Sequence, residues 1–306
     1  MKHINQGFIR NLLSHLLALV WSRVGHLFSD KLYLKVRFFL LMGKKLNLEN
    51  PQTYNEKLQW LKLYDRNPDY TKMVDKYAVK EYVASIIGPE YVIPTIGVWD
   101  SPEIIEWSRL PNQFVLKTTN GGGGEGVVIC KDINKFDKKA AIRILKRDIK
   151  SDWRIGMEWP YKNVTHRIIA EERITPSSGI NDLYDYKFFC FNGKVKALFV
   201  ASDRQSMNEE VKFDFYDADF NHLPFKQGHS NARIEPVKPR HFELMKKLAE
   251  QLSKGMCHVR VDMYDLGDKV LFGELTFFHF SGTIPFVPEE WDNIFGDWLT
   301  LKKSNS

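Results

Sequence analysis

The sequence predicts an α+β protein in which antiparallel β-hairpins follow a helical N-terminal part. Two strand pairs carry this prediction: residues 186–202 turn at Asn192-Gly193, and residues 258–277 turn at 266–268. Helices and strands do not alternate as they would in a parallel βαβ sheet. With 306 residues, of which 43% are hydrophobic, the chain can form one large or two to three small packed units.

The N-terminal segment, residues 8–28, has the pattern of an amphipathic helix. Its polar stripe consists of Asn11, His15, Ser22 and His26. The unbroken apolar run 16–21 is far shorter than the roughly 20 residues that a membrane span needs, and there is no signal-peptide cleavage pattern. The segment is expected either to lie on an anionic membrane surface or to pack against its own domain.

The net charge of +6 belongs to the first fifty residues, which contain eight Lys or Arg against two Asp or Glu. The rest of the chain is therefore neutral, which argues against a nucleic-acid groove across the protein. The three cysteines, Cys130, Cys190 and Cys257, are dispersed and form no CxxC pair. They indicate reduced, buried thiols in a cytoplasmic protein.

The elements up to residue 112 are mostly helical. Residues 51–87 are expected to form helices, because their leucines fall near helical spacing and a glycine follows. A short strand interrupted by proline is expected over 91–99. Residues 101–107 are predicted to form a short helix, with Ser101 as N-cap and Pro102 at the first helical position.

The remaining elements are mostly strands. Residues 114–117 and 126–132 are expected to be strands joined by a glycine loop, and a basic helix is expected over 138–148. Another strand is expected over 167–174. Besides the two hairpins, the C-terminal part contains a helix within residues 234–255.

The glycine loop lies in FVLKTTNGGGGEGVVICKD, residues 114–132, and Lys117 precedes it. Glycines let backbone N–H groups approach phosphate oxygens, and a lysine adds a mobile positive charge. The loop is not GxxxxGK[ST], because its lysine comes first, and it is not GxGxxG before a helix, because a strand follows. Taken alone, it is either a phosphate-binding loop or a flexible hairpin tip.

A pair of carboxylates marks the last hairpin, RVDMYDLGDKVLFGELT. Asp262 and Glu274 lie on its two arms, so antiparallel pairing can bring them to one face. Hard oxygen ligands beside phosphates are what Mg²⁺ requires. Arg260 is two residues before Asp262 and points to the same face. The alternative is a surface pair with a salt bridge.

Two further polar pairs lie on strands. Glu171 and Glu172 end an apolar strand, where they either adjoin an adenine-binding hinge or are simply exposed. Asp185 and Lys187 share one face of the strand that opens the first hairpin, and solvated strand polarity is the alternative.

Taken in order, these pieces resemble the ATP-grasp superfamily from about residue 71 to residue 288. The similar pieces are Asp75-Lys76 with YVIPTIGVW, the lysine and glycine loop of FVLKTTNGGGGEGVVI, RIIAEERI, DYKFFCFNGKV, and RVDMY…LFGELTFFHFSG. The stretches NPQTYNEKLQWLKLYD and DKYAVKEYV resemble, more narrowly, the TupA-like branch of teichuronopeptide and capsular polysaccharide clusters. The resemblance implies an ATP-grasp fold, two α+β subdomains that clasp ATP.

The resemblance also implies a role for each matching residue. The α- and β-phosphates would be held by Lys76 and Lys117, and the β- and γ-phosphates by backbone N–H groups around Gly122, Gly123, Gly124 and Gly126. The adenine and ribose would be met by Glu171, Glu172, Ile174 and Asp182. Lys187 and Arg260 would neutralise charge on the transferred phosphoryl group, and Mg²⁺ would be held by Asp262, Glu274 and Thr276. Thr276 stands where the family usually has asparagine, which puts a second metal in doubt.

The activity implied by the resemblance is carboxylate–amine ligation in surface polysaccharide biosynthesis. A carboxylate, such as a uronic acid, would attack the γ-phosphate, and an amine would then displace phosphate from the acylphosphate. Such chemistry needs no side-chain nucleophile, and His258 is expected to be structural. The rival functions are an ATP-grasp kinase, a capsule-cluster glycosyltransferase and a degenerate nucleotide-binding scaffold.

Four regions are expected. Residues 1–50 form the basic helical segment, and 51–112 form a helical region before the ATP-grasp part. Residues 113–175 would form the small subdomain with its glycine-rich flap, and 176–306 the C-terminal subdomain with the metal site. The N-terminal segment would attach the protein to the cytoplasmic face of the membrane.

Overall fold

A computed structural model describes residues 16–122, 124, 126–177, 183–203 and 210–302. Gly123 and Asp182, both expected in the nucleotide site, lie outside this range, as does the start of the N-terminal helix. Within the described part, residues 16–24 are helical, followed by the 3₁₀-helix η1 (Gly25–Leu27). None of the described helices is long and apolar enough to cross a bilayer.

The helices expected within 51–87, over 138–148 and within 234–255 are present, and a helix near the C-terminus, over 290–298, was not predicted. The α-helices are α2 (Asp30–Met42), α3 (Tyr54–Tyr64), α4 (Tyr70–Val74), α5 (Val79–Ile87), α6 (Lys138–Asp148), α7 (Phe242–Leu252) and α8 (Glu290–Trp298). The short 3₁₀-helices are η2 (Pro89–Tyr91), η3 (Pro102–Ile104), η4 (Trp107–Arg109), η5 (Ile133–Lys135), η6 (Trp153–Ile155), η7 (Trp159–Asn163) and η8 (His279–Gly282). A capping box between Thr53 and Glu56 starts α3, and Gly43 in the left-handed region ends α2.

The strands form two antiparallel sheets and a small ribbon. The small sheet has the order β1-β4-β2-β3, with β1 (Thr95–Trp99), β4 (Ile168–Glu172), β2 (Phe114–Thr118) and β3 (Val128–Cys130). The large sheet has the order β10-β9-β5-β6-β7, with β10 (Val270–Thr276), β9 (His258–Asp265), β5 (Asp185–Phe191), β6 (Lys194–Ser202) and β7 (Lys212–Asp217). The ribbon pairs β8 (Lys226–Gln227) with β11 (Phe286–Val287). The predicted α+β fold with antiparallel hairpins is confirmed.

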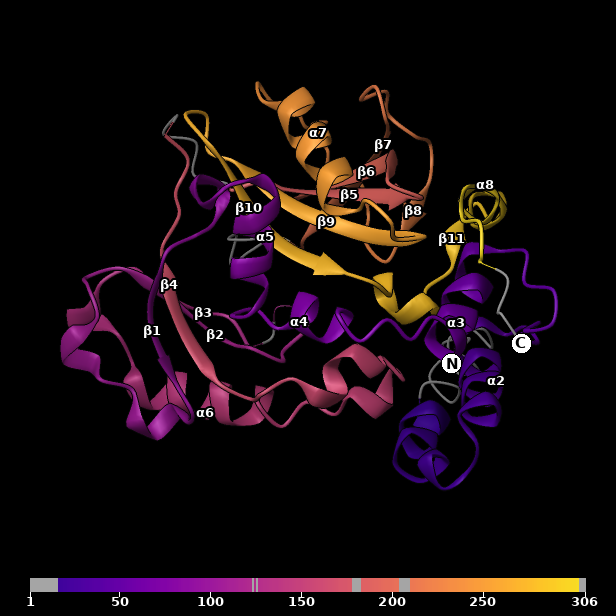
Figure 1. Cartoon of the computed structure of the whole chain (residues 1–306), viewed down its shortest axis with the longest axis horizontal. Coiled ribbons are helices and arrows are strands. Elements are labelled where there is room, and N and C mark those ends of the chain that lie inside the picture. The colour runs from indigo at the N-terminus through magenta and orange to yellow at the C-terminus, as the bar shows by residue number, and fades with distance from the viewer. Residues whose placement is uncertain (1–15, 123, 125, 178–182, 204–209, 303–306) are drawn as a thin grey trace, which may run out of the picture.

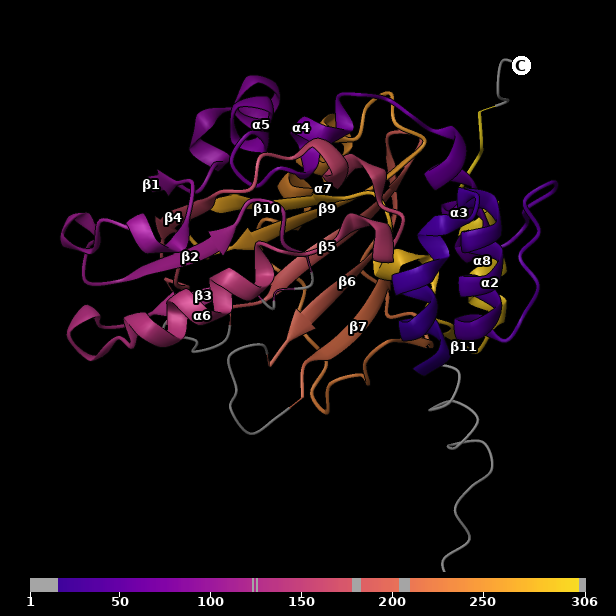
Figure 2. The same ribbon diagram turned by 90° about the horizontal axis from the view of Figure 1, so that it is seen from below.

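The large sheet lies above the small sheet in the view of Figure 1, and α2, α3 and α8 gather at one end of the molecule. Helices α4 and α5 lie together at one edge of the molecule in Figure 2. Helix α6 runs along β2 and β3 (Figure 2). The expected boundary at residue 113 stays a prediction, although β1, which precedes it, pairs with β4 in the small sheet.

Strand alternation decides which small-sheet residues can reach the large sheet. Phe114 and Leu116 of β2 pack in one apolar core with Leu145 of α6. The alternate residues of β2, Val115 and Lys117, point to the opposite face. Lys117 therefore lies on the side away from α6. There its ammonium group forms an ion pair with Glu171 of β4.

The large sheet is covered on one face by α7, where Phe188 stacks near Phe242 and the Cys190 thiol contacts Ala249. The other face is only partly covered. At one end Tyr54 of α3 packs edge-on against Phe189. Polar residues of β5, β9 and β10 also lie on this face, beside Phe199 of β6, whose ring centroid is 5.6 Å from the Arg260 guanidinium carbon.

Two local predictions need correction. Residues 101–107 do not form one helix: η3 covers only Pro102–Ile104, and the Ser101 side chain caps nothing. Two adjacent β-branched residues follow Glu103, and they disfavour a continued helix. The strand expected over 91–99 begins only at Thr95, because Pro94 cannot donate to a strand ladder and residues 89–91 form η2.

Candidate active site

Lys117 and Glu171 form the centre of the small-sheet part of the site. The Lys117 Nζ lies 2.5 Å from one Glu171 oxygen, and Lys80 Nζ of α5 lies 2.6 Å from the other. The carboxylate is only 6% exposed. Burial acts to raise the pKa of Glu171, but the two ammonium groups outweigh it and hold the pKa below its usual value. Glu171 is thus an ionised anchor for two lysines.

Lys76 lies at a break between two helices. The Asp75 carboxylate accepts hydrogen bonds from the backbone N–H groups of Tyr77 (2.8 Å) and Ala78 (3.0 Å), which ends α4 and lets α5 restart. The Lys76 backbone N–H donates to Thr119 O at 3.1 Å. Its ammonium donates to Gly121 O, at the start of the glycine loop. The motif Asp75-Lys76 therefore ties this break to the loop.

The glycines of the loop serve two purposes. Gly121 and Gly126 surround the Asp148 carboxylate, and a Cβ on either would overlap with it. Asp148, at the end of α6, also accepts a hydrogen bond from the Thr118 hydroxyl. Gly122 and Gly124 instead face open space, so their backbone is accessible to a ligand. The two ends of the loop are fixed and its tip is exposed.

The large-sheet part of the site begins with three strands in register. Lys187 of β5 is the cross-strand partner of Asp262 of β9, and Asp262 is the partner of Glu274 of β10. The Lys187 ammonium contacts Asp262 and also lies 2.7 Å from Asp185 Oδ2. The predicted pairing of Asp185 with Lys187 on one strand face is therefore present.

A β-bulge at Gly273 places Glu274 beside Asp262. The register of β9 and β10 shifts between Phe272 and Glu274, so one extra residue lies on β10. Without the shift Glu274 would face Val261, on the other side of the sheet. The predicted meeting of the two carboxylates thus depends on this bulge.

Arg260 joins these carboxylates to one another. Its guanidinium donates to both oxygens of Asp262 at 2.7 and 2.8 Å, to Glu274 Oε1 at 3.1 Å and to the Thr276 hydroxyl at 2.9 Å. Its remaining Nη1 contacts His279 Nδ1 at 2.8 Å. The carboxylates hold the pKa of Arg260 above its usual value despite burial. The guanidinium is therefore a fixed positive charge.

The two parts of the site lie close enough to influence each other. Burial would raise the pKa of Glu274, but Lys187 of the large sheet, Lys76 and Arg260 lower it to about 2. Lys117 is likewise influenced by Glu274 as well as by Glu171. The lysines near the glycine loop therefore face the carboxylates of the large sheet.

The predicted adenine residues lie in different surroundings. Ile174 packs beside a buried apolar cluster that joins the two sheets, made of Ile93, Leu183, Leu266 and Leu271. Glu172 is exposed at the end of β4, and Glu171 points toward the lysines. Among the predicted adenine residues that the structure describes, Ile174 is the one that adjoins an apolar surface for a base.

The donor atoms around Asp262 suit magnesium. The possible ligand atoms are all oxygens. They come from the carboxylates of Asp262 and Glu274 on adjacent strands and from the Thr276 hydroxyl, which lies 3.3 Å from Glu274 Oε1. Within the described ranges, no group of three or more His, Cys, Asp or Glu side chains could hold a metal. Both Asp262 oxygens accept hydrogen bonds from Arg260 or Lys187. The Glu274 side chain is 37% exposed and is therefore more accessible to an ion.

The nucleophilic side chains nearby are structural. His258 is buried, with its ring nitrogens 2.9 Å from the Tyr54 hydroxyl and 3.0 Å from Cys190 O. Burial lowers the pKa of His258 to about 3, so the ring is neutral. All three cysteines are free and buried, as predicted. The structural role expected for His258 agrees with these contacts.

A family model described as TupA-like ATP-grasp matches residues 56–300. The chain belongs to the TupA-like ATP-grasp family. The predicted family and fold are thereby confirmed, and membership supports an ATP-dependent enzyme of the ligase type. No curated protein matches the chain.

Solved ATP-grasp structures resemble this TupA-like protein at low identity. D-Alanine–D-alanine ligase from Helicobacter pylori is 13% identical, with 81% of this chain and 69% of that chain covered and a TM-score of 0.44. D-Cycloserine synthetase DcsG is 15% identical, with 74% and 69% covered and a TM-score of 0.42. The ATP-grasp ligase PsnB, in a complex with minimal precursor, Mg and ADP, is 13% identical, with 73% and 57% covered and a TM-score of 0.38. This chain therefore spans less than two thirds of PsnB.

Sequence reasoning did not single out Lys80, Asp148 or His279. Lys80 was within reach of sequence reasoning as a basic residue near the start of the helix that follows Asp75-Lys76. Asp148 is the only acid in the basic helix α6, which is a weaker signal. No pattern in the sequence indicates that His279 contacts Arg260.

Proposed function

We propose that this protein is an ATP-dependent carboxylate–amine ligase that works through an acylphosphate. The observation that carries the proposal is the register of β5, β9 and β10, which puts Lys187, Asp262 and Glu274 side by side opposite the lysines of the glycine loop. Such an array can neutralise the charge of a triphosphate and of a phosphoryl group in transfer. Family membership supports the same reaction class.

The phosphates of ATP would lie between Lys76, Lys117 and the loop tip. Lys117 is held by Glu171 and therefore needs little reorganisation to meet a phosphate. The exposed backbone of Gly122 and Gly124 can donate N–H groups to phosphate oxygens. Gly126 has a different role, because it packs on Asp148.

The adenine would lie against Ile174 and the apolar cluster beside it, where the two sheets approach. An apolar slot with backbone polar groups at its edge is a common setting for a planar base. Of the hinge acids, Glu171 acts in this proposal through Lys117, while the exposed Glu172 is free to approach the nucleotide from the strand end.

Magnesium would be held by Asp262 and Glu274, with Thr276 as a further oxygen donor. When bound, Mg²⁺ supplies positive charge to the β- and γ-phosphates. Arg260 binds both carboxylates and so fixes their orientation. Lys187 and Arg260 are the protein's own cations at the point where charge moves from the phosphate to the acyl oxygen.

The two chemical steps need positioning rather than a protein nucleophile. A substrate carboxylate oxygen attacks the γ-phosphorus, and ADP leaves. An amine nitrogen then attacks the acyl carbon, and inorganic phosphate leaves with the electron pair of the broken C–O bond. The neutral, buried His258 and the buried cysteines take no part.

The substrate class proposed is a uronic acid or a similar carboxylate of a bacterial surface polysaccharide, joined to an amino acid or another amine. A screen for ADP release tests it, with D-glucuronate and D-galacturonate as carboxylates and amino acids or amino sugars as amines. The proposal expects ADP and phosphate only when both substrates are present. ADP release with phosphate retained on the product, independent of amine, would identify a kinase instead. Binding of a UDP-sugar without ATP binding would identify a glycosyltransferase.

We also propose that the N-terminal segment rests on the anionic cytoplasmic face of a membrane. Its described residues expose a set of large apolar side chains, among them Leu16, Leu19, Val20, Leu27 and Phe28, at 51%, 61%, 58%, 76% and 51%. Exposed apolar residues in such number favour a docked state. The excess of Lys and Arg in the first fifty residues is complementary to anionic lipid.

A further inference from the structure

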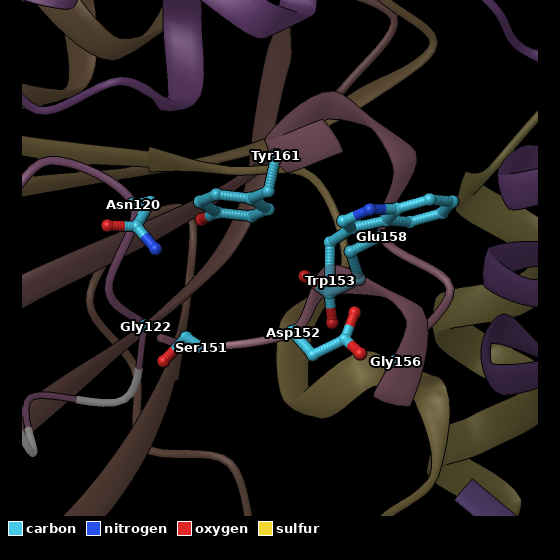
Figure 3. Close-up of a pocket in the computed structure, with 8 residues that line it drawn as sticks. All are labelled: Asn120, Gly122, Ser151, Asp152, Trp153, Gly156, Glu158 and Tyr161. Carbon is cyan, nitrogen blue, oxygen red and sulfur yellow. The ribbon is translucent and has the colours of Figure 1, made fainter. Parts of the chain in front are cut away.

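A cavity of about 150 Å³ lies beside the glycine loop, and nothing above assigns it a ligand. Its lining consists of Asn120, Gly122, Ser151, Asp152, Trp153, Gly156, Glu158 and Tyr161 (Figure 3). A cavity of this size holds a molecule about as large as benzene. It would therefore accept one small ring or a short chain.

Two carboxyl groups, those of Asp152 and Glu158, belong to the lining, whereas no Lys or Arg belongs to the described lining. Asp152 is already paired with Arg154, at 2.7 Å. Asn120, which is only 5% exposed, turns its carboxamide nitrogen toward the other lining residues and its oxygen away from them (Figure 3). That nitrogen donates to Ile149 O at 3.1 Å. Glu158 is therefore the acidic group of the lining that is left to interact with a ligand.

The Glu158 carboxylate can still accept hydrogen bonds from a ligand. Lys62 lies behind it and is 1% exposed, but its three donors go elsewhere: to Ser281 O and Oγ, both at 2.8 Å, and to Gln59 Oε1 at 3.2 Å. The Ser281 hydroxyl donates to Gly156 O at 3.3 Å. Burial raises the pKa of Glu158, so its charged form lacks full compensation and a cation beside it would be favoured. The charged groups that face Glu158 are Lys62, Arg37 and Arg260, and none of them lines the cavity.

Two aromatic rings complete the cavity, those of Trp153 and Tyr161 (Figure 3). Aromatic faces attract cations. The Trp153 ring already does so, because Lys162 Nζ lies 5.8 Å from its centroid. The acidic side chains and aromatic rings of the lining together favour a ligand with a positively charged hydrogen-bond donor, such as an ammonium group, over an anionic ligand.

The position of the cavity connects it to the phosphate site. Gly122 belongs to the glycine loop, and the Tyr161 hydroxyl is close to Glu274, Arg260 and Asp262. Burial, together with Glu158 and Glu274, raises the pKa of that hydroxyl. A group bound in the cavity would thus lie next to the place where the acylphosphate forms.

We propose that this cavity binds the amine co-substrate, with Glu158 accepting from its ammonium group and Trp153 and Tyr161 flanking it. The carboxylate substrate would then bind elsewhere, nearer to Arg260 and Lys187. The inference rests on the proposed ligase function and specifies which substrate this part of the site selects. A small primary amine, free or at the end of a larger molecule, is the class that fits the volume.

Saturation-transfer NMR at pH 7 with three probes of similar size tests this inference. The probes are 2-aminoethanol, ethylene glycol and glycolate, which present an ammonium, a neutral hydroxyl and a carboxylate. The wild type is expected to bind 2-aminoethanol in preference to the other two. Glu158→Gln should weaken that binding at least tenfold, while Glu90→Gln, an exposed control, should leave it unchanged.

A thermal shift with Mg-ATP on the same variants separates this inference from the proposed function. Stabilisation by Mg-ATP that persists in Glu158→Gln shows that the fold and the nucleotide site are intact. If the wild type binds Mg-ATP but prefers glycolate, or binds no 2-aminoethanol, the amine assignment is overturned while the ligase proposal stands. Unchanged 2-aminoethanol binding in Glu158→Gln would overturn it as well.

Discussion

Replacing Glu171 with glutamine tests the idea that one carboxylate anchors two lysines of the nucleotide site. The change keeps the size of the side chain but removes the charge between Lys80 and Lys117, whose Nζ atoms lie 2.6 and 2.5 Å away. The amide oxygen can still accept from one ammonium, but its NH₂ group then faces the other. Breaking a buried ion pair by removing one partner costs about 3–5 kcal/mol. We expect a loss near the lower end of that range.

Urea unfolding of the nucleotide-free protein measures this loss. Glu172→Gln is the matched control, because Glu172 is the next residue and is exposed; its effect should stay within about 0.5 kcal/mol. In saturating Mg-ATP the deficit of Glu171→Gln should shrink, because phosphate replaces part of the missing negative charge beside Lys117. Equal stability of Glu171→Gln and Glu172→Gln without nucleotide would refute the reasoning.

The remaining predictions concern the metal site, acid stability and the membrane. Asp262→Asn and Glu274→Gln should each reduce ADP production about a hundredfold or more without loss of fold, and full activity in either would exclude the metal assignment. His258 stays neutral down to about pH 3 in the folded state, whereas an unfolded histidine takes a proton below about pH 6.5. Wild-type stability should therefore fall relative to His258→Gln by about 3 kcal/mol between pH 7 and pH 4, and parallel pH curves in urea unfolding would contradict this. A Leu19→Ser, Val20→Ser double variant should lose co-sedimentation with phosphatidylglycerol vesicles, while Val237→Ser, exposed at 80% elsewhere, should not; equal sedimentation of all three would count against membrane docking.

The sequence was sufficient to predict the hairpins because their turns are short-range signals. Asn192 and Gly193 both have positive φ, as the turn between β5 and β6 requires. The pairing of Asp262 with Glu274 was predicted correctly, but the Gly273 bulge that makes it possible was not. A glycine within a strand is a known sign of a bulge, so this feature was within reach.

Contacts between distant segments could not be predicted in the same way. Glu158 and Lys62 are almost a hundred residues apart, and they approach only because α3 and the segment before β4 pack around Ser281. Periodicity describes one element at a time and carries no information on such packing. The amine cavity therefore emerges only from the folded chain.

A thermal-shift titration with Mg-ATP tests the central claim, an ATP site between the two sheets, most directly. At one hundred times the dissociation constant, Mg-ATP should stabilise the wild type by about 2.7 kcal/mol. Lys117→Ala should lose most of this gain, while Lys131→Ala, an exposed lysine just after β3, should keep it. A wild type that Mg-ATP does not stabilise would contradict the account.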